Sequence, residues 1–539
     1  MSTITKRHIL LLSPFIGYIL FVIPFLNQLP MHEEVIHLVH SSTWEGALQY
    51  FWHPPTYVLL AKLTRSVLGD SYQVLYLIGI LSAILNLYLI YRILNAMPVS
   101  GSLSRQWYLL VGMWIFVLMP IAVHGSLLLE IEGTVLTPMC LLAVWFYIKN
   151  IEEEDSIRFN VIAGLLFGLS MWAKYFATPF LLIFAVFLSQ CSGGKPFLRA
   201  FRNLSIILTS ALGFFIPTYL LYSYLFIPGI NSFAFVFSEK PKEGITLFLS
   251  GKIIIPIVSK LTAFTFWFSP FFIAFLLYFG YKLLRRWREF PMERFFLISI
   301  FLIFIFYLIA HPYPFAESKY FYPMFPLVAI LSSRLFAINK IKLPPLRYVF
   351  LIPIAGALMF FVLGDPLYKS LYFYRSQLTG RMVSYIGLYV FVNLAIFSIV
   401  YLILSRRVGG FINTFSSSLI YLTISASLSL FLNQAIGQYQ TKYQYGETGI
   451  GETIAYVNSE IAHENKKMGK IILPGEINYY AGLNKASSFR EFGISSDWRW
   501  IVERKVNILR LSPENLKLLN NRYDLIKQIG SYRIYKRKG

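Results

Sequence analysis

Two adjacent carboxylates, Glu33 and Glu34, follow the first long apolar segment of the sequence. A carboxylate that is partly removed from water has a raised pKa and accepts a proton more readily. Both residues are therefore candidates for a general base, Glu33 first and Glu34 as its close rival. The alternative is that they form a solvated helix end.

A second pair of carboxylates, Glu130 and Glu132, lies between two apolar segments. Carboxylates at the edge of hydrocarbon are costly and often mark functional sites. We expect Glu132 to take part in catalysis or in positioning, and Glu130 to contact substrate beside it. The alternative is an acidic helix start, which the helix dipole favours.

Three basic side chains stand where they could neutralise a phosphate group. His53 precedes Pro54 and Pro55, which fix an extended corner of the chain. Lys174 and Lys319 each border an apolar segment, and Tyr320 follows Lys319. We predict substrate contacts for these residues; the alternatives are an incidental turn histidine and lysines that extend toward the headgroups.

Several common cofactor motifs are missing from the sequence. It contains no phosphate-binding loop of the Walker type, no dinucleotide fingerprint and no His/Cys metal pattern. The two cysteines imply no disulfide framework. We expect no cofactor and assign no metal ligands, although a divalent cation is not excluded.

Membrane helices must position these residues. Of 539 residues, 56% are hydrophobic and only 14% are charged, whereas soluble domains have about 25% charged residues. A helix needs roughly 20 apolar residues to cross a bilayer. The N-terminal apolar run 9–29 is too long for a signal peptide and predicts the first membrane helix.

Hydropathy predicts an all-α polytopic membrane domain of about 13 transmembrane helices over residues 1–436. The pair 159–173 and 175–190 is either two helices or one helix broken around Lys174. The expected spans are 8–30, 72–96, 106–125, 132–149, 159–173, 175–190, 203–226, 261–283, 295–311, 320–338, 348–365, 383–404 and 411–436.

Residues 437–539 are more polar and predict a small C-terminal α/β domain. We expect an amphipathic helix at 452–465, a strand at 470–474 and a hairpin at 523–538 with its turn at Gly530-Ser531. Apolar residues at helical spacing in 44–68 predict short helices at the membrane interface.

The distribution of basic residues predicts the orientation. They concentrate in alternate short loops, which places the N-terminus in the cytoplasm and the C-terminal domain on the extracytoplasmic face of the cell membrane. The net charge of +22 then fits anionic lipid headgroups, and we expect no nucleic-acid partner.

The order of these motifs resembles the C-type glycosyltransferases that use polyprenyl-phosphate sugars, in particular the protein mannosyltransferase and aminoarabinose transferase branch. The resemblance covers about residues 1–340. It rests on five motifs, namely Glu33-Glu34, His53-Pro54-Pro55, Glu132 or Glu130, Gly164 to Gly168 with Lys174, and Lys319-Tyr320 with Pro323 and Pro326. This sequence has Glu where the family has Asp at both acidic positions, and Lys319 where it has Arg.

The resemblance implies a membrane enzyme with an extracytoplasmic active site. Its donor is a polyprenyl-phosphate-linked sugar, and its acceptor is a hydroxyl group on a lipid, glycan or protein. A carboxylate base, Glu33 or Glu34, deprotonates the acceptor, and the transfer inverts the anomeric carbon. The Trp-Trp-Asp signature of oligosaccharyltransferases is absent from the sequence, which argues against transfer of a preassembled glycan to Asn.

Two other functions compete with this interpretation. A transporter or lipid flippase would also be polytopic, but such proteins often show internal repeats, and none is visible in the sequence. A non-catalytic membrane scaffold could present the C-terminal domain.

Overall fold

The computed structural model describes most of the chain. The described residues are 3–23, 26, 33–50, 54–98, 105–127, 131–152, 156–174, 177–228, 277, 280–281, 283–310, 318–338, 351–359, 380–408, 410–436, 449–461, 470–474, 477, 479, 498–504, 508, 511–530 and 532–538.

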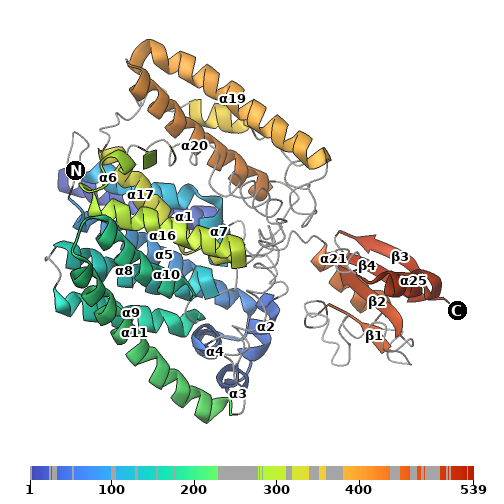
Figure 1. Cartoon of the computed structure of the whole chain (residues 1–539). Coiled ribbons are helices and arrows are strands. Elements are labelled where there is room, and N and C mark those ends of the chain that lie inside the picture. Colours follow the sequence, from blue (N-terminus) through green and yellow to red (C-terminus); the bar gives the residue numbers. More distant parts are fainter. Residues whose placement is uncertain are drawn as a thin grey trace.

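Helices form the main body of the protein (Figure 1). Their bounds are α1 Thr3–Val22, α5 Tyr72–Ala96, α6 Arg105–Leu118, α7 Pro120–Leu127, α8 Thr137–Glu152, α9 Ile157–Lys174, α10 Ala177–Ser192, α11 Phe197–Phe226, α16 Pro291–Ala310, α17 Met324–Ile338, α19 Gly380–Val408 and α20 Phe411–Ile436. Among the described residues, four helical segments are long and apolar enough to cross a membrane: Tyr72–Ala96, Glu132–Ile151, Phe197–Phe226 and Pro291–Ile309.

Several predicted spans differ from the structure, and the number of 13 spans is not confirmed. The expected helix 106–125 is interrupted at Met119, and Pro120 begins α7, because proline suits the first position of a helix but disrupts its interior. The first helix ends at Val22 instead of residue 30. The pair around Lys174 forms two helices, α9 and α10. Most of the predicted span 261–283 lies outside the described residues.

Glycines let α9 and α11 pack backbone against backbone. A Cβ atom on Gly164 would lie 2.5 Å from the carbonyl oxygen of Ile207, and one on Gly168 would lie 2.6 Å from that of Ala211. Small residues four positions apart allow this close approach between membrane helices. The contact fixes α9, and with it Lys174 at the last position of the helix.

The described part of the segment between α1 and α5 contains three short helices, α2 Glu33–His40, α3 Trp44–Leu48 and α4 Thr56–Leu68. Two of them, α3 and α4, lie within the predicted range 44–68. The three helices expose apolar side chains, including Val39, Trp44 and Leu63, while Tyr57 and Ala61 are fully buried. This amphipathic pattern suits a membrane interface.

The C-terminal residues form a four-stranded sheet with the order β1-β2-β4-β3, drawn beside the helical body in Figure 1. The strands are β1 Lys470–Ile472, β2 Trp498–Arg504, β3 Tyr523–Ile529 and β4 Tyr532–Arg537. The predicted strand and hairpin are therefore confirmed, with Gly530 in the turn at φ 54°. The predicted helix 452–465 is α21 Ile450–Tyr456 followed by a π-helical turn, η5 Val457–Ile461.

Two apolar cores hold this α/β region together, one on each face of the sheet. The first joins α21 and η5 to the sheet through Val457, Ile461 and Val502. The second joins α25 Pro513–Arg522 to the sheet through Leu519 and Tyr535. The predicted α/β character of this region is therefore correct.

Candidate active site

A buried ion pair joins two residues that the sequence singles out separately. Lys174 Nζ donates to Oε1 of Glu132. The Glu132 side chain is 1% exposed and that of Lys174 is 12% exposed, so both charges are largely withdrawn from water. A buried charge must be paired to be tolerated, and each of these residues supplies the partner that the other needs.

Tyr320 completes this cluster. Lys174 Nζ lies 4.0 Å from the centre of the Tyr320 ring, a cation–π geometry. The Tyr320 ring stacks on Tyr307 of α16 at 5.5 Å. The Tyr307 hydroxyl shares a hydrogen bond of 2.8 Å with Thr178 of α10. Glu132, Lys174 and Tyr320, three of the eight predicted site residues, therefore lie together.

A π-helical turn, η2 Glu132–Leu136, carries the Glu132 carboxylate. Turns of this type are rare and frequently occur at functional sites. The turn contacts α7 closely, because a Cβ atom on Gly133 would collide with the carbonyl oxygen of Gly125. At the neighbouring residue of α7, a Cβ atom on Gly79 of α5 would collide with the carbonyl oxygen of Ser126. These glycines allow α5, α7 and η2 to approach closely enough to fix Glu132.

One oxygen of Glu132 remains available. Its Oε2 atom is buried and has no hydrogen-bond partner among the residues that the structure describes. A buried carboxylate oxygen without a partner is costly, and such groups in native proteins often have a functional reason. Oε2 can accept a hydrogen bond from a hydroxyl group, as in a sugar or an acceptor.

Hydrogen bonds attach the segment between α1 and α5 to α9, which carries Lys174, and to α11. The Thr56 hydroxyl of α4 donates to the carbonyl oxygen of Trp172 at 2.7 Å, two residues before Lys174. The Trp172 indole donates to Thr218 of α11 at 2.9 Å. The Tyr222 hydroxyl of α11 lies 2.8 Å from the carbonyl oxygen of Leu48. The start of α4 is therefore fixed next to the ion pair.

The side chains of the other five predicted site residues lie outside the described part of the structure. For Glu33 and Glu34 the backbone forms the first turn of α2, and for Lys319 it belongs to the 3-10 turn η3 Ser318–Phe321. His53 and Glu130 are not described at all. Their roles stay predictions.

The sequence does not predict two residues that support the ion-pair cluster. Tyr307 and Thr178 support Tyr320, but each lies inside an apolar helix, and their types are common there. No local signal distinguishes them, because their role depends on the packing of α10 against α16. Among the described residues, no group of three His, Cys, Asp or Glu side chains could hold a metal ion.

Comparisons with known proteins match this fold and this region. Residues 52–222 match the family model described as dolichyl-phosphate-mannose-protein mannosyltransferase. The crystal structure of ArnT from Cupriavidus metallidurans bound to undecaprenyl phosphate is similar, with a TM-score of 0.55 and 14% identity over 99% of this chain and 98% of that chain. The apo structure of the same protein gives 0.54, again with 14% identity over 99% and 98%. No curated protein matches the chain.

The resemblance to the C-type membrane glycosyltransferases is confirmed by these findings. The family match includes His53, Glu132 and Lys174, and the ArnT-like fold extends over nearly the whole chain. The protein therefore has an ArnT-like fold. Its long apolar helical segments, four of them among the described residues, are those of a multi-pass membrane protein.

Proposed function

We propose that this protein is a membrane glycosyltransferase that moves a sugar from a polyprenyl-phosphate donor to a hydroxyl acceptor. The observation that carries the proposal is the buried cluster of Glu132, Lys174 and Tyr320. Glu132 and Lys174 lie inside the segment 52–222 that matches a mannosyltransferase family. The similar structure of ArnT with bound undecaprenyl phosphate supports a polyprenyl-linked donor.

Each charged group has a role in the proposed reaction. Glu33 or Glu34 accepts the proton of the acceptor hydroxyl as its oxygen attacks the anomeric carbon. The bond from that carbon to the phosphate oxygen breaks, and the lipid phosphate leaves with the electron pair. Attack opposite the leaving group inverts the configuration. This reaction combines general-base catalysis at the acceptor hydroxyl with electrostatic stabilisation of the leaving phosphate.

Cations stabilise the departing phosphate in this proposal. Lys174 is the candidate among the described residues, because its ammonium is the cation of the Glu132–Lys174–Tyr320 cluster. Lys319 and His53 are the further candidates. Glu132 uses its available Oε2 atom to orient a hydroxyl of the sugar or of the acceptor, and Glu130 lies two residues before it.

The proposed orientation puts the reaction on the extracytoplasmic face, with the N-terminus in the cytoplasm and the α/β region of residues 437–539 outside. The bias of basic residues between alternate loops supports it. Lys517 is exposed on α25, so Lys517→Cys can be labelled in intact cells. Labelling only after the membrane is opened would contradict the orientation.

The decisive experiment is turnover by the purified full-length protein in lipid nanodiscs. Polyprenyl-phosphate sugars of several types are supplied with lipid, glycan and peptide hydroxyl acceptors, and released polyprenyl phosphate is measured. We expect release with one donor type, and its loss in Glu132→Gln. If no donor is cleaved and vesicles instead show donor lipid crossing the bilayer, the protein is a transporter.

A further inference from the structure

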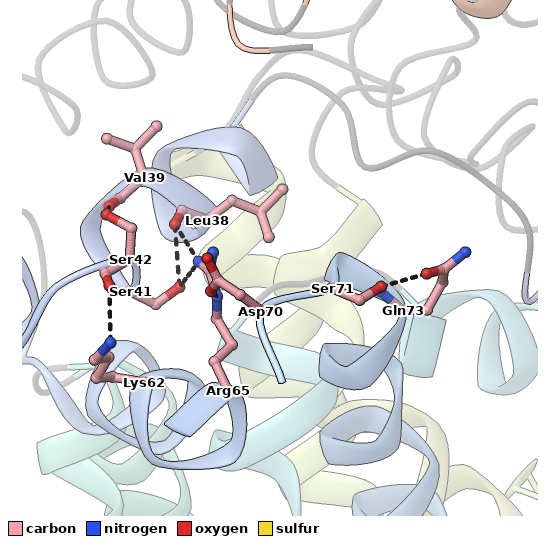
Figure 2. A network of polar contacts seen from close by, with 9 residues as sticks. All are labelled: Leu38, Val39, Ser41, Ser42, Lys62, Arg65, Asp70, Ser71 and Gln73. Atoms are coloured by element: carbon pink, nitrogen blue, oxygen red, sulfur yellow. Dashed lines mark hydrogen bonds and ion pairs between the residues drawn. The ribbon is translucent and has the colours of Figure 1, made fainter. Parts of the chain in front are cut away.

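Arg65 is a buried cation that makes none of the contacts described above for Glu132, Lys174 and Tyr320. It lies near the end of α4, and its side chain is 3% exposed. Figure 2 shows how it reaches out of α4 toward α2 and Asp70. A guanidinium buried this deeply needs several acceptors in a fixed geometry.

Three acceptors surround the guanidinium. Nη1 donates to the carbonyl oxygen of Leu38 at 2.6 Å and to the Ser41 hydroxyl at 3.0 Å, and Nε donates to Asp70. Leu38 lies in the last turn of α2, where carbonyl groups have no partner within the helix. Arg65 therefore caps the carboxyl end of α2 and fixes this helix on α4.

The opposite end of α2 carries the acidic pair. Glu33 and Glu34 form the start of this eight-residue helix, so any rotation or shift of α2 about its capped end displaces both. The other end of α4 is fixed as well, because Thr56 donates to Trp172 beside Lys174. Helix α4 thus connects two helices through hydrogen bonds: α2 is bonded near one end of α4, and α9, which carries Lys174, is bonded to the other.

We infer that Arg65 is a positioning residue that holds the α2 carboxylates at a set place relative to Lys174 and Glu132. The inference rests on the proposed function, because it requires one of the two carboxylates to be the base. Arg65 touches neither substrate in this scheme; it acts through α2. Misplacement of a reacting group by about 1 Å can cost about 10²-fold in rate.

A double-mutant cycle tests this in the full-length protein in nanodiscs. We expect Arg65→Gln to lower kcat by about 10- to 100-fold while the KM for the donor changes less than about twofold, because Lys174 keeps its place. In a background that already lacks the base, Glu33→Gln or Glu34→Gln, the same change should cost almost nothing more. An equal further loss in that background, or a rise in donor KM with unchanged kcat, would overturn the inference.

Milder variants and a control keep the test usable if Arg65→Gln does not fold. Ser41→Ala removes one acceptor of Arg65, and Arg65→Lys keeps the charge but not the fork, so both should show the same kcat effect to a smaller degree. Lys62→Gln is the control, since Lys62 donates at 2.8 Å to Ser42, beyond the end of α2, and should stay near wild type.

The two hypotheses fail in different ways. If Glu33→Gln and Glu34→Gln both turn over at the wild-type rate, the proposed base is wrong, and the role of Arg65 falls with it. If one of them is inactive while Arg65→Gln, Arg65→Lys and Ser41→Ala all keep full kcat, only the inference about Arg65 is wrong.

Discussion

Lys174 and Glu132 are 42 residues apart in the chain, yet the ammonium of one donates directly to the buried carboxylate of the other. The pair joins the end of α9 to the π-helical turn before α8. It balances two charges within the helical body. Oε2 of Glu132 has no hydrogen-bond partner among the described residues, and the Tyr320 ring lies against the ammonium of Lys174.

Removing one partner of this pair should destabilise the protein. Lys174→Met leaves the Glu132 carboxylate buried without a cation, and such a loss typically costs about 3–5 kcal/mol. The double variant Lys174→Met/Glu132→Gln should recover much of that stability but no activity. Tm in nanodiscs and turnover measure the two effects; equal Tm values in the single and double variants would contradict a coupled pair.

Loss of the base should reduce the rate without loss of donor binding. A positioned general base contributes roughly 10²–10⁴-fold, and Glu33→Gln keeps the size of the side chain while it removes the proton acceptor. Glu34→Gln is measured in parallel, because the two neighbours are rivals for the role. Turnover of Glu33→Gln within about threefold of wild type, far below a general-base effect, would exclude Glu33.

Lys319 should contribute to donor affinity. A hydrogen bond to a charged group is worth about 1.5–3 kcal/mol, so Lys319→Ala should weaken donor binding by that amount. Lys319→Arg keeps the charge and should retain more affinity and activity. Binding of the polyprenyl-phosphate donor to each purified variant is the measurement, and wild-type affinity in Lys319→Ala would remove this residue from the site.

Gly168 should be sensitive even to alanine. A Cβ atom there would lie 2.6 Å from a backbone oxygen of α11, so α9 and α11 must separate, at a cost of about 1–3 kcal/mol. The shift would also move Lys174, six residues further along α9, and lower turnover. Gly213→Ala on α11 is the matched control, because no neighbouring atom lies within 4 Å of its added Cβ. Equal Tm values in the two variants would contradict the close packing.

His40 should make the protein less stable in mild acid. Burial lowers the pKa of His40 below 6.5; the hydrogen bond from Nδ1 to the Gly46 carbonyl partly opposes this, and nearby His37 adds a smaller lowering. Its stabilising contribution is complete above the unfolded pKa and is lost as the pH falls through the lower folded pKa. Tm measured from about pH 8 to about pH 5 should therefore decline. His40→Gln should flatten that decline, and an unchanged slope would rule His40 out as its cause.

Much of the helical architecture could be predicted from the sequence. The predicted span 72–96 coincides with α5, and the turn at Gly530 between β3 and β4 was placed correctly. Hydropathy averaged over about 20 residues and the conformational freedom of glycine are local properties, so they need no knowledge of the rest of the chain. The types of the candidate site residues were also evident, because charges beside apolar segments are conspicuous.

Only the tertiary structure decided which of those residues meet. The pairing of Glu132 with Lys174 depends on a π-helical turn and on glycines that bring α5, α7 and η2 together, and the capping of α2 by Arg65 depends on how α4 crosses it. The sequence marks each of these side chains as polar or charged but says nothing of distance. The contact between two side chains is set by the packing of whole helices, to which residues far apart in the chain contribute together.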